Sequence, residues 1–466
     1  MKLKFLFIII LLITSNGNSQ DTLKEPPPYC MLRELENYSY LEHQNEYKKD
    51  PWDALKNIHL DKTGNSRLSI GGQFRPRFEH FTNRFWVEND NVNYYSQRLA
   101  LYSNIVLGKQ IRFYTEFYHG YKSGDKEFAQ SDDLAVFQSF IDFSFPIDEN
   151  QELITRIGRQ ELSLGSQRLA GIREGPNIRQ SYDMLKIHWF YNKMNLQAFY
   201  GKEVISGFSV FDNKSNLFDG NAINPSLWGI YTQFKIEKDI GKNELYYLGF
   251  HAKQARFNDV VGTETRHSLG LRRYGKIGKN IRYNTEIIYQ FGKIGNSDIS
   301  AFSIATDGYY KLNRVTLKPE LGLKLEFSTG DRSLNDGRIQ TFNPMFVNPA
   351  HYSLSGTITP ANLLSIHPSV SFELTEKWWV YTEWAYFKRN SENDALYKPT
   401  RFISVPALPN QSKEIGHQFG LTSRYEINRQ LAIELDFSYF IAGEYLSENN
   451  LDNNILHFAP TINYRF

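Results

Sequence analysis

Four arginines in one short stretch are the residues of this chain best suited to bind a ligand. The stretch from Gly158 to Asp183 holds more guanidinium groups than carboxylates: the arginines are Arg159, Arg168, Arg173 and Arg179, and the acids are Glu161, Glu174 and Asp183. A guanidinium is permanently charged and carries five N–H donors, so it binds an anion wherever no carboxylate of the protein occupies it. The stretch therefore predicts anion binding.

Segments of about ten residues, in which apolar and polar residues alternate, must position these arginines. In the segment 281–291, Ile281, Ile287 and Phe291 share one face, while Arg282 and Glu286 share the other. The last residues repeat the pattern, with Leu456, Phe458, Ile462, Tyr464 and Phe466 on one face and His457, Thr461, Asn463 and Arg465 on the other. An apolar face toward lipid and a polar face toward water is the two-residue alternation of a membrane-spanning strand.

Eighteen such segments are predicted. They start near residues 67, 96, 111, 135, 152, 181, 194, 227, 243, 265, 281, 299, 315, 364, 378, 414, 431 and 455. Their connections alternate between short turns, such as 108–110 and 375–377, and long stretches rich in Gly, Asn, Asp and Pro, such as 202–226 and 329–363. Bacterial barrels place short turns in the periplasm and long loops outside.

The fold class predicted is therefore all-β: a transmembrane up-and-down antiparallel β-barrel of about 18 strands, which is wide enough for an aqueous channel. Lys2 and Lys4 precede the apolar run Phe5–Ile13, which reads as a signal peptide over 1–19. Residues 20–65 form a polar periplasmic lead-in, partly ordered at best, and 66–466 the barrel. The expected place is the outer membrane of a Gram-negative bacterium, where lipid and the barrel-insertion machinery are partners and the terminal Phe466 is the insertion signal.

Strand parity assigns five more arginines to the lumen. Phe74 and Phe78 point to lipid on the first strand, so Arg75 and Arg77 point inward. The same reasoning adds Arg112, Arg282 and Arg465. A charged Arg or Lys on the lipid face would cost about 2 to 4 kcal/mol near the midplane, which enforces the assignment. These arginines either form ladders with inward carboxylates that brace a wet interior, or remain unpaired and make the pore prefer anions.

One detail of the arginine-rich stretch conflicts with a regular strand. Arg156 and Arg159 differ in parity, so both can face inward only if a bulge or a strand end separates them. We expect such an irregularity.

Composition excludes several other functions. Without residues 1–19 the chain has as many acidic as basic residues, so net charge indicates no partner, and nothing points to nucleic acid. The single Cys30 has no assigned role. The sequence contains no metal-ligand cluster, phosphate-binding loop or dinucleotide fingerprint, so neither a metal nor another cofactor is expected. Residues 20–65 are too few for the plug domain of an energy-coupled receptor, which leaves transport passive.

Two alternatives to a channel belong to other functional classes. A hydrolase at the barrel rim would need a histidine near a nucleophile or an acidic pair. His119, His251 and His351 could lie near the rim, but no Ser, His and Asp grouping stands out. A surface adhesin would use the loops 202–226 and 329–363 for binding, although loops of that size also serve as pore lids. No enzymatic activity is predicted.

Three stretches resemble the alginate-export family of outer-membrane barrels. They are Gly158–Asp183, the run Leu68–Glu79 with Leu55–Leu60 before it, and Ser328–Asp331 followed by Thr341–Phe346 and Asn362. The resemblance implies eighteen strands and an electropositive constriction that passes an anionic, uronic-acid type polysaccharide or oligosaccharide, with a possible periplasmic partner. Matching positions make Arg75, Arg77, Arg159, Arg168, Arg173 and Arg179 the lining candidates. The alternative is a general diffusion or uptake porin for small anionic or other solutes.

Overall fold

The computed structural model describes residues 23–217, 223–236, 241–352, 355–399, 402–408 and 410–466. The signal peptide expected over 1–19 lies outside the described residues. None of the helices in the described ranges is long and apolar enough to cross a membrane. The short helical elements are η1 (Arg33–Leu35), η2 (Ser39–Glu46), η3 (Asp53–Leu55), η4 (Arg84–Trp86), η5 (Pro349–His351) and α1 (Glu444–Ser447).

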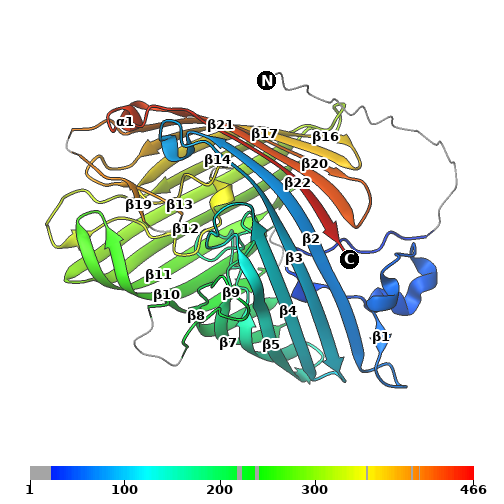
Figure 1. Ribbon diagram of the computed structural model, residues 1–466. Helices are drawn as coiled ribbons and strands as arrows, with labels where there is room; N and C mark the ends of the chain where they lie inside the picture. The colour runs from blue at the N-terminus through cyan, green and yellow to red at the C-terminus, as the bar shows by residue number, and fades with distance from the viewer. Residues whose placement is uncertain (1–22, 218–222, 237–240, 353–354, 400–401, 409) are drawn as a thin grey trace.

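Eighteen antiparallel strands within the described ranges form a closed wall, as predicted (Figure 1). They are β2 (Arg67–Thr82), β3 (Val92–Leu107), β4 (Ile111–Lys122), β5 (Asp132–Asp148), β6 (Gln151–Gln160), β7 (Tyr182–Tyr191), β8 (Met194–Glu203), β9 (Ser226–Phe234), β10 (Gly241–Phe257), β11 (Val260–Ile277), β12 (Ile281–Ile294), β13 (Ser297–Lys311), β14 (Glu320–Ser328), β16 (Leu363–Thr375), β17 (Trp378–Arg389), β20 (Glu414–Glu426), β21 (Leu431–Ala442) and β22 (Ile455–Arg465). Two short strands are added to this sheet, β1 (Ile58–His59) beside β2 and β15 (Arg338–Ile339) parallel to β13. β18 (Leu396–Tyr397) and β19 (Ile403–Val405) form a separate pair.

The wall closes between its first and last strands. In the β2–β22 pair, Gln73 lies opposite Arg465 and Arg77 opposite Thr461. Arg465 therefore lies beside the strand that carries Arg75 and Arg77. The strand expected near residue 315 begins later, at Glu320, because Leu317 and Lys318 adopt positive φ and Pro319 follows them.

The connections alternate as expected, with two exceptions at the end that carries the long loops. The short turns include 108–110, 192–193 and 376–377, and the long loops include 161–181 and 329–362. The connections 258–259 and 295–296 also lie at the long-loop end, but each is a two-residue hairpin turn. We call the end with the short turns periplasmic.

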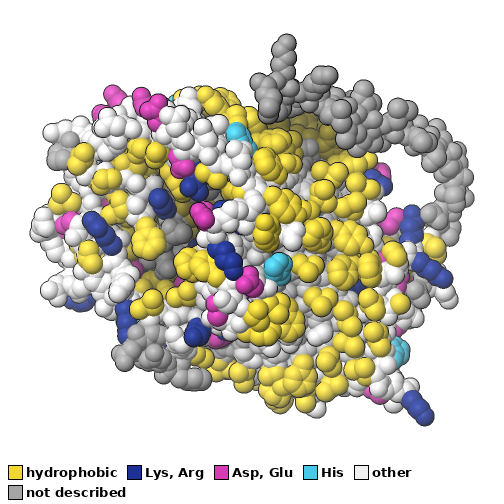
Figure 2. Space-filling view, viewed as in Figure 1, with side chains coloured by type: hydrophobic (Ala, Val, Ile, Leu, Met, Phe, Trp, Pro, Cys, Tyr) yellow, Lys and Arg dark blue, Asp and Glu magenta, His cyan; other side chains and the backbone are white. Residues whose placement is uncertain are grey.

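The outer face of the wall is apolar. Ile287 and Tyr289 on β12 are exposed, whereas Glu286 and Gln290 on either side of them are buried. Phe458 and Ile462 on β22 are likewise exposed, and the polar residues of the other face, such as Thr461, are buried. Figure 2 shows hydrophobic side chains gathered over the wall formed by the first strands and β22. This is the surface that a barrel presents to lipid.

The interior is filled by loops and by the amino-terminal segment. The loop 161–181 packs with the loop 329–362 in an apolar cluster that includes Leu169, Phe346 and the wall residue Phe250. A second cluster joins the loops 329–362 and 390–413 to α1 and to wall strands such as β17. Residues 23–57 enter the periplasmic mouth, where Arg33 reaches the inner face of β4. The part of the lumen that these loops and the amino-terminal segment leave unfilled is therefore where a solute could bind.

Candidate functional site

Arg168 joins the loop 161–181 to the inner wall. Its guanidinium lies 3.1 Å from Asp307 on β13, 3.1 Å from Glu326 on β14 and 3.6 Å from Glu286 on β12. The side chain is only 11% exposed. Because three carboxylates surround one guanidinium, Arg168 serves here as a brace that fixes the loop against the wall.

The loop 161–181 is also joined to the loop 329–362. The Gly171 amide donates to the Phe346 carbonyl at 2.9 Å, and the Phe346 amide donates to the Leu169 carbonyl at 3.0 Å. Arg173 Nε donates to the Val347 carbonyl at 3.2 Å. These bonds hold the two loops together as one constriction inside the barrel.

Backbone carbonyls of the loop 161–181 accept from arginines of the first strands. Arg75 Nη2 donates to the carbonyls of Gly175 at 2.8 Å and Pro176 at 3.0 Å. Arg98 on β3 donates to the Pro176 carbonyl at 2.6 Å and lies 2.9 Å from the Glu174 carboxylate. The loop thus runs from β2 and β3 on one side of the lumen to β12–β14 on the other.

Glu174 and Arg179 complete this charged cluster. Arg179 is buried and lies 2.6 Å from Glu161 and 3.3 Å from Glu174. Burial alone would raise the pKa of Glu174, but the guanidinium groups of Arg98, Arg179 and Arg75 hold that pKa well below its ordinary value. Glu174 is therefore ionised and held by these three guanidiniums, and the cluster works as a structural brace.

Arg159 corrects one expectation for the site. It pairs across the strands with the exposed Ser139 and with Asp183, and it shares parity with Ile157, which is 49% exposed. Its guanidinium binds the Asp183 carboxylate at 2.8 Å. Arg159 therefore lies on the outer side of the wall, not toward the lumen.

The expected irregularity between Arg156 and Arg159 is absent from β6. The register with β5 is continuous through Gly158, which adopts a φ of +131°. Arg156 faces inward and binds Asp142 at 2.7 Å, and Arg159 faces outward. The two arginines simply occupy opposite faces, so neither a bulge nor a strand end is needed.

The remaining predicted arginines lie on the inner face with partners. Arg77 lies 3.0 Å from Glu79, and Arg112 lies 3.3 Å from Asp142. Arg282 binds Glu320 with two nitrogens. Arg465 Nη1 donates to the Tyr29 carbonyl at 3.4 Å. The inner wall thus contains the arginine and carboxylate ladders that were one of the two expectations.

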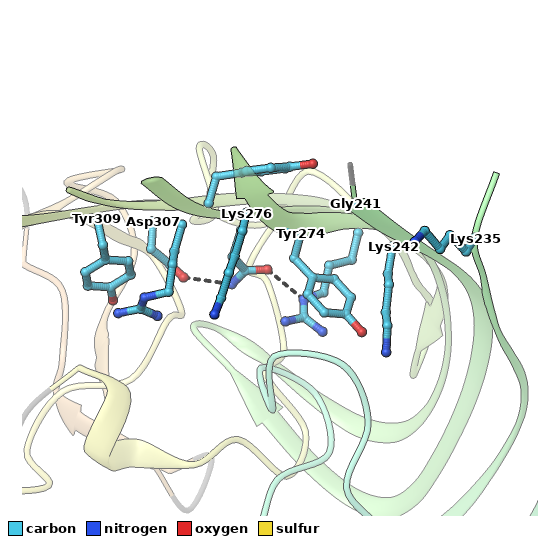
Figure 3. A pocket seen from close by; sticks show the side chains of 12 residues that line it. Lys235, Gly241, Lys242, Tyr274, Lys276, Asp307 and Tyr309 are labelled. Carbon is cyan, nitrogen blue, oxygen red and sulfur yellow. Dashed lines mark hydrogen bonds between the residues drawn. The ribbon is translucent and has the colours of Figure 1, made fainter. Parts of the chain in front are cut away.

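A pocket of about 580 Å³ opens on the inner face at the periplasmic ends of β9–β13. Five basic side chains line it: Lys235, Lys242, Arg272, Lys276 and Arg282. Figure 3 shows Lys242, Tyr274, Lys276, Asp307 and Tyr309 on the same side of the sheet. Asp307 is the one acidic residue of the described lining.

The two arginines of the pocket are oriented by neighbours. Arg272 Nε donates to Asn284 Oδ1 at 2.7 Å, and Asn284 donates in turn to Asp307 at 2.7 Å. The Arg272 guanidinium lies 4.0 Å from the Tyr274 ring centroid, and that of Arg282 lies 4.2 Å from the Tyr309 ring centroid. Positive charge and aromatic surface therefore occur together on the pocket wall.

The three lysines of the pocket differ from its two arginines in their ion pairing. Lys235, Lys242 and Lys276 form no ion pair with any residue that the structure describes. Their charges face the open volume, because Lys235 and Lys242 are exposed and Lys276 shares the parity of Arg272. The positive potential of the pocket therefore rests mainly on these lysines.

The pocket leads toward the constriction. A second pocket, of about 270 Å³, shares Arg272, Asn284, Asp307 and Tyr309 with the first and extends to Arg168 and Lys324. Lys324 lies 2.9 Å from Glu383. The two pockets form one route from the periplasmic mouth to the joined loops.

The lysine pocket was not among the residues predicted from sequence, except for Arg282. The signal was present in the segment 269–276, where Leu269 and Leu271 alternate with Arg272, Tyr274 and Lys276 on the opposite face. Arg282 was found by the same parity argument on the next strand. The described residues contain no group of three or more His, Cys, Asp or Glu side chains that could hold a metal ion.

Comparison with known proteins agrees with this geometry. A family model described as "Alginate export" matches residues 66–454. No curated protein matches the sequence.

Solved porins of Pseudomonas aeruginosa share the fold at low identity. OpdO has 9% identity and a TM-score of 0.57, over 86% of this chain and 97% of that one. OpdK with vanillate has 10% identity and a TM-score of 0.55, over 85% and 98%. OccK2 (OpdF) in complex with glucuronate has 11% identity and a TM-score of 0.53, over 88% and 99%.

The closed wall and its apolar outer face, together with the family match, define a channel of the Gram-negative outer membrane. The family match extends over most of the chain, from the first wall strand almost to the last. This chain belongs to the alginate export family, which confirms the resemblance.

Proposed function

We propose that this protein is a passive channel for anionic saccharides of the uronic-acid type. The observation that carries the proposal is the inner pocket in which Lys235, Lys242 and Lys276 lack ion-pair partners among the described residues. A permeating carboxylate would meet cations that no described residue neutralises, in a cleft that focuses their field. Tyr274 and Tyr309 add rings on which the apolar face of a sugar can pack.

The size of the route favours short saccharides over a long chain. A volume of about 580 Å³ falls within the range of roughly 300 to 1,000 Å³ for small-molecule sites. Beyond it, the loops 161–181 and 329–362 narrow the lumen. We therefore favour uronate monomers and short oligomers, and passage of an anionic polysaccharide is the second candidate because the family is described by alginate export.

Two observations support a channel over an adhesin. The loop 329–362, which an adhesin would present outward, is packed inside the barrel with Phe346 in an apolar cluster. Asp331 of the same loop is buried and accepts a hydrogen bond from Asn258 Nδ2 at 3.2 Å. The solved neighbour holding glucuronate is a further reason to test uronates first.

The proposal is tested by solute block of single channels in planar bilayers. Glucuronate added on the periplasmic side should lower the chloride current in a concentration-dependent way, whereas glucose at equal concentration should leave it unchanged. Small anions such as acetate should compete with glucuronate. Equal block by glucose and glucuronate would contradict a site that recognises charge.

A further inference from the structure

The amino-terminal segment 23–57 lies inside the periplasmic mouth, on the side away from the lysine pocket. Arg33 is 4% exposed and forms an ion pair with Glu116 on β4 at 2.6 Å. Its Nη1 also donates to the Tyr118 hydroxyl at 2.9 Å. Figure 1 shows this segment beside the beginning of β2 and the end of the chain.

Aromatic and charged contacts fix the rest of the segment to the rim. Trp52 Nε1 donates to the Tyr464 hydroxyl at 2.8 Å, and the Trp52 ring lies 4.8 Å from that of Phe466. Asp50 lies 2.6 Å from Arg429 in the turn between β20 and β21. The segment therefore closes the mouth along β2–β4 and β20–β22.

Three arginines behind the segment donate to its backbone carbonyls. Arg112 Nη2 donates to the Glu34 carbonyl at 2.5 Å, and Arg179 Nη1 to the Met31 carbonyl at 3.0 Å. Arg465 Nη1 donates to the Tyr29 carbonyl at 3.4 Å and has no ion pair within the described part of the chain. Neutral oxygens of the segment thus occupy donors that bind a carboxylate more strongly.

The fit of the segment is incomplete at its innermost point. Glu34 is 5% exposed, and its Oε2 accepts no hydrogen bond from any described residue. A buried oxygen without a donor costs free energy, which lowers the energy needed to withdraw the segment.

We propose that residues 23–57 are a displaceable plug that covers a second anion site at Arg465, the one of these three arginines that forms no ion pair with a described residue. With the plug withdrawn, the Arg465 guanidinium loses its contact with the Tyr29 carbonyl, faces the β22 side of the mouth and binds a carboxylate of an anionic saccharide. The proposal rests on the proposed function only for the identity of this ligand. Movement of the plug is tested by unit conductance and by alkylation of Cys30, and neither measurement depends on the ion preference of the channel.

Charge reversal at Arg33 tests the plug in the full-length protein. Arg33→Glu places a second carboxylate against Glu116, so the plug should withdraw and unit conductance should rise. Cys30, the single cysteine of the chain, lies in the plug, and burial raises the pKa of its thiol. Its alkylation by a bulky maleimide should be slow in the unaltered protein and fast in Arg33→Glu.

Two further variants serve as controls. Arg33→Glu combined with Glu116→Arg restores the ion pair and should restore both conductance and slow alkylation. Lys24→Glu reverses a charge of the same segment in an exposed pair with Glu46. It should change neither the unit conductance nor the rate of Cys30 alkylation. Unaltered conductance in Arg33→Glu, or failure of the double variant to restore it, would overturn the plug.

A deletion of residues 23–57 tests the covered site and replaces Arg33→Glu if that variant does not assemble. The deletion should raise conductance and make the channel sensitive to block by trigalacturonate, and Arg465→Gln in the same background should weaken the block. Conductance equal to that of the intact protein would overturn the plug. Raised conductance without added block would overturn the anion site, even if glucuronate still blocks the intact channel at the lysine pocket.

Discussion

At the scale of single residues, the charges of the lumen fall into two groups. Most arginines are neutralised, as Arg168 is by three carboxylates and Arg179 by two. The lysines of the pocket face open volume without such partners among the described residues. Ion preference should therefore depend on the lysines, whereas loop structure depends on the arginines.

Removing pocket lysines should reduce the preference for anions. For Lys242→Gln and Lys276→Gln, each lost charge should lower the anion-to-cation permeability ratio roughly two-fold, the effect of one unit charge on an ion about 8 Å away in water. Reversal potentials in a KCl gradient measure the ratio. Arg273→Gln on the same strand is the matched control, because Arg273 has the opposite parity and binds Asn243. A ratio unchanged by both lysine substitutions would assign selectivity elsewhere.

Removing the Arg168 charge should affect both selectivity and structure. Arg168→Gln leaves Glu286, Asp307 and Glu326 without their shared counter-charge, and breaking a buried ion pair typically costs about 3 to 5 kcal/mol. The loop 161–181 should detach, so unit conductance should rise while the channel shifts toward cations. Arg168→Lys keeps the charge and should preserve the selectivity. A Gln variant that is more anion-selective than the original would contradict this role.

At the scale of the elements, the strands could be predicted and the loops could not. Alternation located all eighteen wall strands and the inward face of Arg75, Arg112 and Arg282, because one buried face imposes a two-residue period. Arg159 was misplaced because matching to the family motif carries no strand parity, and parity puts Arg159 on the outer face with Ile157. The inward folding of 161–181 rests on contacts between residues far apart in the chain, such as Arg168 with Glu326. No local pattern encodes such contacts.

The family motif Ser328–Asp331 is explained by a loop junction near the outer end of the barrel. Asp331 and Asp394 are both buried, and the Asp331 amide donates to Asp394 Oδ2 at 2.8 Å. Asn258 Nδ2 donates to Asp331 at 3.2 Å, and Thr341 donates to Asp394 at 2.6 Å. The motif therefore ties the hairpin 258–259 to the loops 329–362 and 390–413.

This junction should weaken as pH rises. Burial, opposed by the Asn258 hydrogen bond and assisted by Asp394 and Asp259, raises the pKa of Asp331 to about 6. The folded loop therefore binds more protons than the unfolded loop between the ordinary value of 3.8 and about 6, so its stability falls as pH rises through that window. Hydrogen-exchange protection of residues 329–342, corrected for intrinsic rates, should decrease across it.

Two substitutions separate Asp331 from the rest of the loop. Asp331→Asn mimics the protonated carboxyl and should remove the pH dependence. Asp336→Asn changes an exposed acid of the same loop and should retain it. Protection that increases with pH in the unaltered protein would refute the assignment.

At the scale of the whole molecule, the barrel is closed at its last residue. The Phe466 amide donates to the Gly72 carbonyl at 3.0 Å, and the Gly72 amide donates to the Phe466 carbonyl at 2.8 Å. The Phe466 ring also packs against Trp52 of the amino-terminal segment. One residue thus joins the first strand, the last strand and the plug.

Deleting Phe466 should therefore impair assembly of the barrel. We expect less heat-modifiable, folded protein in outer-membrane fractions, with loss of both the closing bonds and the terminal aromatic. Phe458→Leu, which changes an exposed aromatic of the same strand, is the control. Equal yields for the deletion and the control would show that closure does not depend on this residue.

The route through this barrel should favour anions, because the lysines of the pocket line it. The most direct measurement is the reversal potential of the unaltered channel in a KCl gradient across a planar bilayer. The lysine-lined pocket predicts a reversal potential displaced toward the chloride equilibrium potential, with added glucuronate reducing the current. Displacement toward the potassium equilibrium potential would show that the route prefers cations and would contradict the anion preference.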